Sequence, residues 1–216
     1  MWAAVDRGRV AVIELLNNLG PDEWARSSLC EGWTVHDVAA HLTMPLLSKR
    51  QLLTLAVRYP GSTNRIIRDG SRYLARKHDR RQVLERLSGL VGHHTTFPGL
   101  SVHEALIDVL GHTLDIAIPN GRDARLDPDA VAIAADRVIS YGGRGNAKVF
   151  RTLPLSGIRL VATDHDWSTG SGPTATGSMA DIFLLLTGRP AGADRLTGPG
   201  ADAIRSRLAD RSTVRR

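Results

Sequence analysis

Glycine and proline pairs divide the first part of the chain into segments of helix length. Gly20-Pro21, Pro60-Gly61 and Pro119-Asn120-Gly121 each follow a stretch whose apolar residues recur at helical spacing. Such segments become stable when their apolar faces pack together, and short connections make neighbouring helices antiparallel. The spacing of these helix-ending residues therefore predicts a mainly α-helical protein built around a bundle of four main helices.

Two capping boxes place helix starts at Thr34, with Asp37 three residues later, and at Ser101, with Glu104. Pro45 cannot donate a backbone hydrogen bond, so we expect it to interrupt the second helix. The helices are predicted at residues 3–19, 34–58, 63–92 with a candidate break near 77–79, 101–118 and 130–140.

The pattern changes after the glycine-rich segment 141–146, which is a candidate hinge. Residues 158–163 are expected to form a strand, 164–177 are rich in turn residues, and 179–186 and 202–208 are expected to be helical. We therefore predict two domains, a helical bundle at 1–145 and a small α/β region at 146–216.

Charge and hydropathy exclude several classes of function. The net charge is +6, but the arginines are spread along the chain and no aromatic residue lies within the basic cluster at 76–81, so nucleic-acid binding is not expected. No apolar run approaches the ~20 residues of a membrane span. Charges at Asp6 and Arg7 interrupt any signal peptide, and the single Cys30 fits a reducing compartment. We expect a cytoplasmic monomer or homodimer.

The residues with the clearest chemical potential are Asp108 and His112, four apart on one predicted helix. Their Cβ atoms would lie about 5–6 Å apart on one face, so a carboxylate and an imidazole could share a metal ion. Neighbouring Leu106, Val109 and Ile116 turn this face inward, where an unpaired carboxylate would be costly.

His41 lies in an apolar stretch of the second helix and could supply a third ligand. Three nitrogen or oxygen ligands with an open position are typical of a catalytic metal site, and zinc is the default for imidazole-rich ligation. The alternative is that these histidines are hydrogen-bonded core residues, since an Asp-x-x-x-His spacing alone is a weak signal.

The surrounding sequence is more specific. Residues 27–42, SSLCEGWTVHDVAAHL, closely resemble the signature of the mycothiol-dependent maleylpyruvate isomerase family, part of the DinB-like superfamily. Residues 108–117, DVLGHTLDIA, look like its second signature, and 160–167 with 170–173 and 186–189 are similar to the C-terminal segment of many members.

The resemblance implies a DinB-like four-helix bundle with one divalent metal. The positions of its ligands map onto His41, Asp108 and His112. In the isomerase itself a glutamate is expected where this chain has Asp108, which is one methylene shorter, and Leu114 stands where tryptophan or glutamine is common.

The resemblance further implies a metal-dependent enzyme that uses mycothiol on a small electrophilic substrate. The thiolate would add to a conjugated double bond, allow rotation and leave, or the adduct would be released by an S-transferase. Two alternatives remain open at this point: a non-catalytic metal-binding or regulatory protein, and a hydrolase that activates water.

No catalytic residue is assigned beyond the metal ligands. His165 and Arg189 are candidate substrate contacts from the C-terminal region. Cys30 is interpreted as a small packing residue, because no basic neighbour is evident to lower its pKa. His36 and His103 are expected to face away from the metal ligands.

Overall fold

A computed structural model describes residues 1–97, 99–144, 150 and 152–213, with the side chains of 211–213 excepted. The elements fall into two compact units, Met1–Arg125 and Leu126–Arg216, and each unit is described by itself. The expected domain boundary at 145/146 and part of the candidate hinge at 141–146 lie outside the described residues. The helix at 128–140 belongs to the second unit rather than to the bundle.

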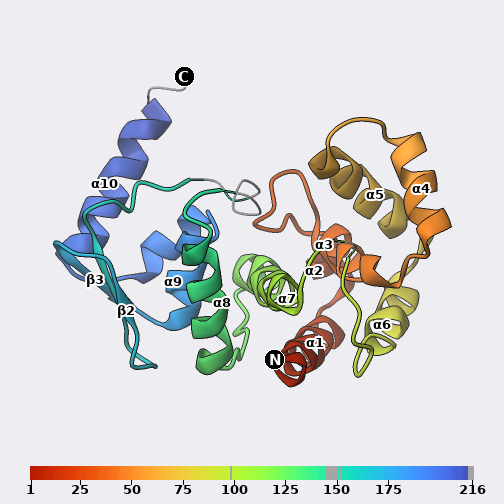
Figure 1. The fold of residues 1–216 in the computed structure, drawn as a ribbon, viewed down its shortest axis with the longest axis horizontal. Coiled ribbons are helices and arrows are strands. Elements are labelled where there is room, and N and C mark those ends of the chain that lie inside the picture. The colour runs from red at the N-terminus through yellow and green to blue at the C-terminus, as the bar shows by residue number, and fades with distance from the viewer. Residues whose placement is uncertain (98, 145–149, 151, 214–216) are drawn as a thin grey trace. The chain divides into compact units, whose positions relative to one another are not determined.

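The regular elements described in the first unit are helices (Figure 1). Its helices are α1 (Trp2–Asn17), α2 (Pro21–Ala25), α3 (Val35–His41), α4 (Lys49–Arg58), α5 (Thr63–Lys77), α6 (Arg80–Ser88) and α7 (Val102–Ala117), with 3-10 turns η1 (Met44–Leu46) and η2 (Ile118–Asn120). Packing of α1 on α7 and of α3 on both α5 and α7 forms the bundle.

Capping chemistry explains where the two helices that carry the candidate ligands begin. Thr34 accepts a hydrogen bond from the Asp37 backbone N–H, and the Asp37 carboxylate accepts one from the Thr34 N–H. At the start of α7 the Ser101 hydroxyl accepts from the His103 N–H, and the Glu104 carboxylate accepts from the Ser101 N–H. Both predicted starts are confirmed, so the candidate ligands lie on helices with capped N-termini.

The long helix expected at 34–58 is divided in two. The α-helix ends at His41, and Pro45 lies in the short 3-10 turn η1 before Ser48 caps α4. The break expected in the third segment is confirmed, since Asp79 caps a separate α6. Between the first two predicted helices lies a further short helix, α2, which begins at Pro21.

The second unit combines helices with a three-stranded sheet of order β2-β1-β3. Its elements are α8 (Pro128–Ser140), β1 (Arg159–Ala162), β2 (Ser168–Thr169), β3 (Thr174–Gly177), α9 (Met179–Leu186), η4 (Pro190–Arg195) and α10 (Pro199–Thr213). Strand β1 pairs antiparallel with β2 and parallel with β3, with Leu160 opposite Thr169 and Ala175. The turn-rich segment thus holds two strands that were not expected.

A buried cluster in which Leu160, Ile182 and Ile204 take part joins this sheet to α9 and α10. The mainly α fold with a small C-terminal α/β region is therefore confirmed. No helix in the described part of the chain is both long enough and apolar enough to span a bilayer.

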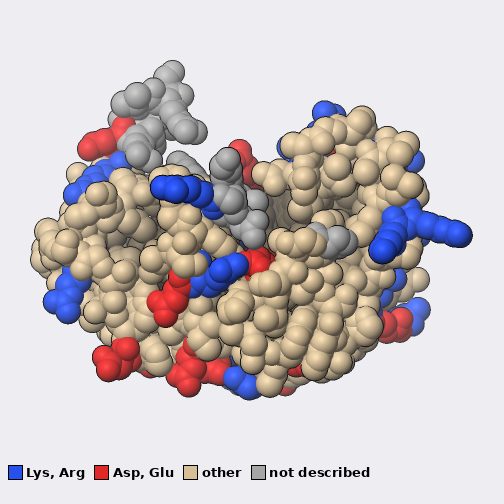
Figure 2. Space-filling view, viewed as in Figure 1, with Lys and Arg blue, Asp and Glu red and all other residues tan. Residues whose placement is uncertain are grey.

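On the face shown in Figure 2, lysine and arginine side chains are scattered among uncharged residues, and the described residues form no continuous basic stripe there. This distribution agrees with the spread of arginines along the sequence.

Close approach of α1 to α7 depends on Gly8. A Cβ added at Gly8 would lie 2.9 Å from Cγ1 of Val109, the residue next to Asp108. We expect Gly8→Val to lower the free energy of unfolding by about 1–3 kcal/mol, because extra volume in a packed interface forces its neighbours apart. Urea unfolding measures the change.

The matched control is Glu14→Val, which introduces the same side chain on the exposed side of α1 and should change stability by no more than about 0.5 kcal/mol. Adding Val109→Ala to Gly8→Val should recover part of the loss. Equal stability of Gly8→Val and the wild type would contradict the role given to this glycine.

Candidate metal centre

Three polar side chains converge between α3 and α7 in the first unit. His41 is the last residue of α3, while Asp108 and His112 lie one turn apart on α7. The carboxylate oxygen Oδ1 of Asp108 lies 3.3 Å from Nε2 of His41 and 3.4 Å from Nε2 of His112. All three ligand atoms lie within 4.8 Å of one another. The structure therefore brings together the three residues singled out from the sequence.

Hydrogen bonds at the opposite ring nitrogens fix how both imidazoles are turned. Nδ1 of His41 lies 3.2 Å from Oγ of Ser71, whose hydroxyl donates to the Ile67 carbonyl 2.7 Å away. Nδ1 of His112 lies 2.9 Å from Oδ2 of Asp115. Each of these oxygens can accept a hydrogen bond from Nδ1–H, and Nε2 is the ring atom that faces the Asp108 carboxylate. Two ring nitrogens and one carboxylate oxygen thus face a common point, which favours a proton or a metal cation there.

The spacing of these atoms fits a zinc ion. Bonds of about 2.0–2.1 Å at tetrahedral angles place neighbouring ligand atoms roughly 3.3–3.4 Å apart. The distances of 3.3 and 3.4 Å from Asp108 to the two imidazoles match this value. The donor set of two imidazoles and one carboxylate is also one that zinc accepts.

Charge coupling within the cluster is strong. Burial alone would raise the pKa of Asp108, but the two imidazoles hold it well below its usual range. Burial would lower the pKa of His112, yet Cys30, Asp108 and Asp115 raise it well above the ordinary value. The site therefore combines an ionised Asp108 carboxylate with a His112 imidazole that holds a proton, and a bound metal cation would take the place of that proton.

Access to the cluster is from the side of Asp108. The side chain of Asp108 is 37% exposed, whereas those of His41 and His112 are each 13% exposed. Trp33, itself buried, packs against both imidazoles with ring centroids 5.3 Å from His41 and 6.3 Å from His112. The indole thus shields the histidines and leaves the carboxylate edge open.

Cys30 is not the simple packing residue expected from the sequence. Its thiol donates to Oδ2 of Asp115 at 3.1 Å, and its sulfur lies 3.7 Å from Nδ1 of His112. That interpretation was wrong because Cys30 is separated from His112 by 82 positions and its neighbours are supplied by the fold.

Asp115 and Ser71 were also missed. The available signal for Asp115 was its place three residues after His112, between the apolar Leu114 and Ile116. A carboxylate there lies inside the bundle and requires a partner. Ser71 gave no comparable signal, because its contact with His41 spans 30 positions.

The other histidines of the first unit play different parts. His36 is half-buried, with Nε2 3.0 Å from the His78 carbonyl and its ring edge-on to Trp24, so it packs rather than faces solvent. Neither His36 nor His103 belongs to a group of possible metal ligands among the described residues.

The two candidate substrate contacts lie in the second unit. Nδ1 of His165 lies 3.3 Å from a carboxylate oxygen of Asp129. Arg189 donates to the Thr187 carbonyl at 2.7 Å, just after α9. Both side chains therefore have partners within their own unit, and their role toward a substrate stays a prediction.

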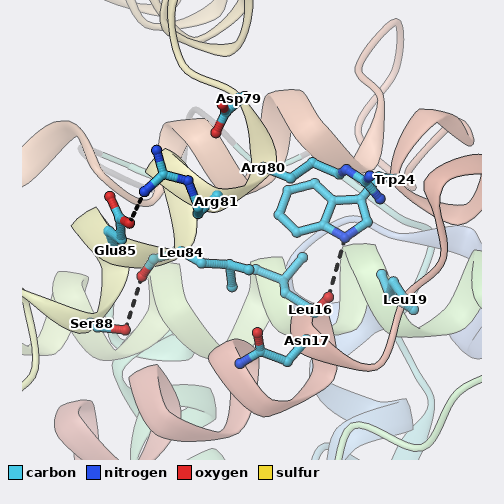
Figure 3. Close-up of a pocket in the computed structure, with 10 residues that line it drawn as sticks. All are labelled: Leu16, Asn17, Leu19, Trp24, Asp79, Arg80, Arg81, Leu84, Glu85 and Ser88. Carbon is cyan, nitrogen blue, oxygen red and sulfur yellow. Dashed lines mark hydrogen bonds and ion pairs between the residues drawn. The ribbon is translucent and has the colours of Figure 1, made fainter.

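A separate hollow of about 830 Å³ lies between α1, α2 and α6 (Figure 3). Trp24 donates to the Leu16 carbonyl, Ser88 donates to that of Leu84, and Arg81 pairs with Glu85. These groups are satisfied internally and none of the three candidate ligands lines the hollow, so we place the chemistry elsewhere.

Comparison with known proteins agrees with the resemblance seen in the sequence. Residues 5–96 match the family model of the mycothiol maleylpyruvate isomerase N-terminal domain, a span that includes His41 but ends before Asp108. No curated protein gives a significant match to the chain.

Two solved structures share the fold. The crystal structure of the mycothiol-dependent maleylpyruvate isomerase has a TM-score of 0.55 and 16% identity, with 93% of this chain and 92% of that chain covered. The crystal structure of a histidine-to-alanine mutant of that isomerase has a TM-score of 0.54 with the same identity and coverage. The predicted DinB-like helical fold is therefore confirmed.

Proposed function

Since residues 5–96 belong to the mycothiol maleylpyruvate isomerase N-terminal domain family, we propose that this protein is a metal-dependent enzyme using a low-molecular-weight thiol such as mycothiol. The residues that would hold the metal are His41, Asp108 and His112. The observation that carries the proposal is the meeting of two Nε2 atoms and one carboxylate oxygen at separations of 3.3 and 3.4 Å.

A divalent metal at this point, zinc by default, would supply a Lewis-acid position that lowers the pKa of a coordinating thiol from its usual ~8.5. The protein's own residues do the rest. Ser71 and Asp115 hold the imidazoles in one orientation, Asp108 contributes negative charge, and Trp33 keeps water from the histidine faces.

The nucleophile would come from the added thiol rather than from the protein. Cys30, the single cysteine, has its sulfur hydrogen-bonded to buried Asp115 and so is not presented to a substrate. A small electrophile with a conjugated double bond would accept the thiolate and rotate about the resulting single bond, and expulsion of the thiolate would then restore the double bond. Release of the adduct instead would make the protein an S-transferase.

This proposal keeps the partners expected from the sequence: a thiol, a small electrophilic molecule, and no nucleic acid. His165 and Arg189 remain proposed contacts for the substrate. The reducing cytoplasm is the proposed compartment, in keeping with the one cysteine of the chain.

Cobalt substitution tests the thiol dependence. Titrating mycothiol into the cobalt-loaded protein should produce a sulfur-to-cobalt absorption band in the near ultraviolet, because the three proposed ligands contain no sulfur. S-methylated mycothiol should give no band, and Cys30→Ser should behave like the wild type, which excludes the protein's own thiol as the source. A cobalt spectrum indifferent to mycothiol would favour a hydrolase or a non-catalytic metal protein instead.

A further inference from the structure

A second set of contacts behind the metal centre is built around Asp115. Its side chain is fully buried on α7, three residues after His112. Its Oδ2 atom lies 2.9 Å from Nδ1 of His112, on the far side of the ring from Asp108. A carboxylate in this setting carries a large desolvation cost, which hydrogen bonds to it must offset.

The segment before α3 supplies a second donor to the same oxygen. Cys30 donates its thiol proton to Oδ2 of Asp115 at 3.1 Å, and the backbone N–H of Leu29 donates to the Asp115 carbonyl at 3.2 Å. The loop that carries Trp33 over the imidazoles is therefore fastened to α7 at Asp115. One buried residue thus connects the ring of His112 with the loop that covers it.

His41 and His112 differ in the hydrogen-bond acceptor that lies next to Nδ1. Oγ of Ser71, a neutral acceptor, lies 3.2 Å from Nδ1 of His41, whereas Asp115 presents an acceptor 2.9 Å from Nδ1 of His112. A carboxylate accepts a proton more strongly than a hydroxyl does, and it raises the electron density at the opposite ring nitrogen. His112 should therefore be the better electron donor of the pair.

We infer that Asp115 is a positioning residue that fixes His112 with Nδ1 protonated and Nε2 free for the metal, while Cys30 supports Asp115 and is not itself a ligand. This inference rests on the proposed metal site. It goes beyond that proposal by assigning the tautomer of His112 and the role of Cys30.

Cys30, His112 and Asp115 also lie close enough together to be read as a ligand group of their own. That arrangement would require both donors to Asp115 to lose their protons and His112 to coordinate through Nδ1. The hydrogen bonds from both groups to one oxygen make the supporting role the better explanation, and the two arrangements give opposite spectroscopic results.

Metal affinity tests the inference, measured by competition between the protein and a chelator for cobalt. Asp115→Asn should bind cobalt about 10–100-fold more weakly than the wild type. Ser71→Ala removes the neutral hydrogen-bond acceptor of His41 and should lower the affinity for cobalt less than Asp115→Asn does. Cys30→Ser keeps a donor to Asp115, so its affinity for cobalt should be close to that of the wild type. Without added thiol, its near-ultraviolet spectrum should match that of the wild type, because Cys30 is not a ligand and contributes no sulfur-to-cobalt band.

Nitrogen NMR of the zinc-loaded wild type gives a second readout that a merely structural role would not produce. The ring of His112 should carry its proton on Nδ1, with that proton shifted downfield by the carboxylate. This measurement keeps the inference testable if Asp115→Asn fails to fold, as circular dichroism would reveal.

Unchanged affinity in a folded Asp115→Asn would overturn the inference, as would coordination through Nδ1 of His112 or loss of a thiolate band in Cys30→Ser. The proposed function would survive unchanged affinity in Asp115→Asn, whereas either of the other two results would also overturn the proposed ligand set of His41, Asp108 and His112. Failure of the wild type to bind cobalt would instead defeat the proposed function itself.

Discussion

Replacing His112 with alanine is expected to lower the affinity for zinc or cobalt by more than about 100-fold. That figure is the upper end of the loss caused by removing a residue that only hydrogen-bonds to a metal ligand. His41→Ala should have the same effect. Each change removes one of the three proposed protein ligands and leaves Asp108 with one of its two imidazole neighbours. Competition with a chelator, followed by metal analysis after gel filtration, measures the loss.

Two histidines outside the cluster serve as matched controls. His36→Ala and His103→Ala should retain metal at the wild-type stoichiometry, since neither residue belongs to a possible ligand group. His36→Ala should be somewhat less stable, because it loses a hydrogen bond to the His78 carbonyl. Equal metal loss in all four alanine variants would show that the fold, and not the site, had been damaged.

Substitutions at Asp108 distinguish the effect of its negative charge from the effect of its side-chain length. The longer side chain of Asp108→Glu keeps the carboxylate, so we expect it to retain metal, whereas Asp108→Asn should bind metal more weakly because it removes the negative charge. This comparison also tests the difference from the glutamate expected in the isomerase.

Loss of Arg9 is expected to cause the largest change in stability of the apo protein. This arginine on α1 is only 5% exposed, and its guanidinium donates to the carbonyls of Leu90 at 2.6 Å and His93 at 3.0 Å. It also pairs with Asp6 at 3.0 Å. Arg9→Leu should lower the free energy of unfolding by about 3–5 kcal/mol, because it leaves these buried carbonyls without their donor and removes the guanidinium partner of Asp6.

Urea unfolding of Arg9→Leu, Arg9→Lys and Arg50→Leu checks this prediction. Arg9→Lys keeps the positive charge but not the planar guanidinium with its several donors, so it should lose less stability than Arg9→Leu. Arg50 is exposed on α4, so Arg50→Leu should change stability by no more than about 0.5 kcal/mol. A similar small effect for Arg9→Leu would mean that solvent satisfies the carbonyls.

Local signals determined much of the fold. Thr34 and Ser101 have short polar side chains followed three residues later by an acid, and both helices start where this pattern places them. The two short strands β2 and β3 were not predictable in the same way. Strand β2 has two residues, and its pairing with Leu160 and Val161 depends on contacts that a local pattern does not contain.

In the candidate site, too, the residues placed by local sequence were predicted and those brought in by long-range contacts were not. Asp108 and His112 lie on one helix, so their spacing alone places them together, and His41 follows from the resemblance around it. The groups that orient these ligands come from distant parts of the chain. Cys30 reaches Asp115 across 85 positions, and helical periodicity carries no information on such a contact.

Anomalous X-ray diffraction from crystals of the zinc-loaded protein tests whether His41, Asp108 and His112 bind one divalent metal. We expect one anomalous peak about 2.0–2.2 Å from Nε2 of both histidines and from the Asp108 carboxylate. A peak bonded instead to Cys30 and Asp115, or the absence of any peak from fully loaded protein, would contradict this expectation.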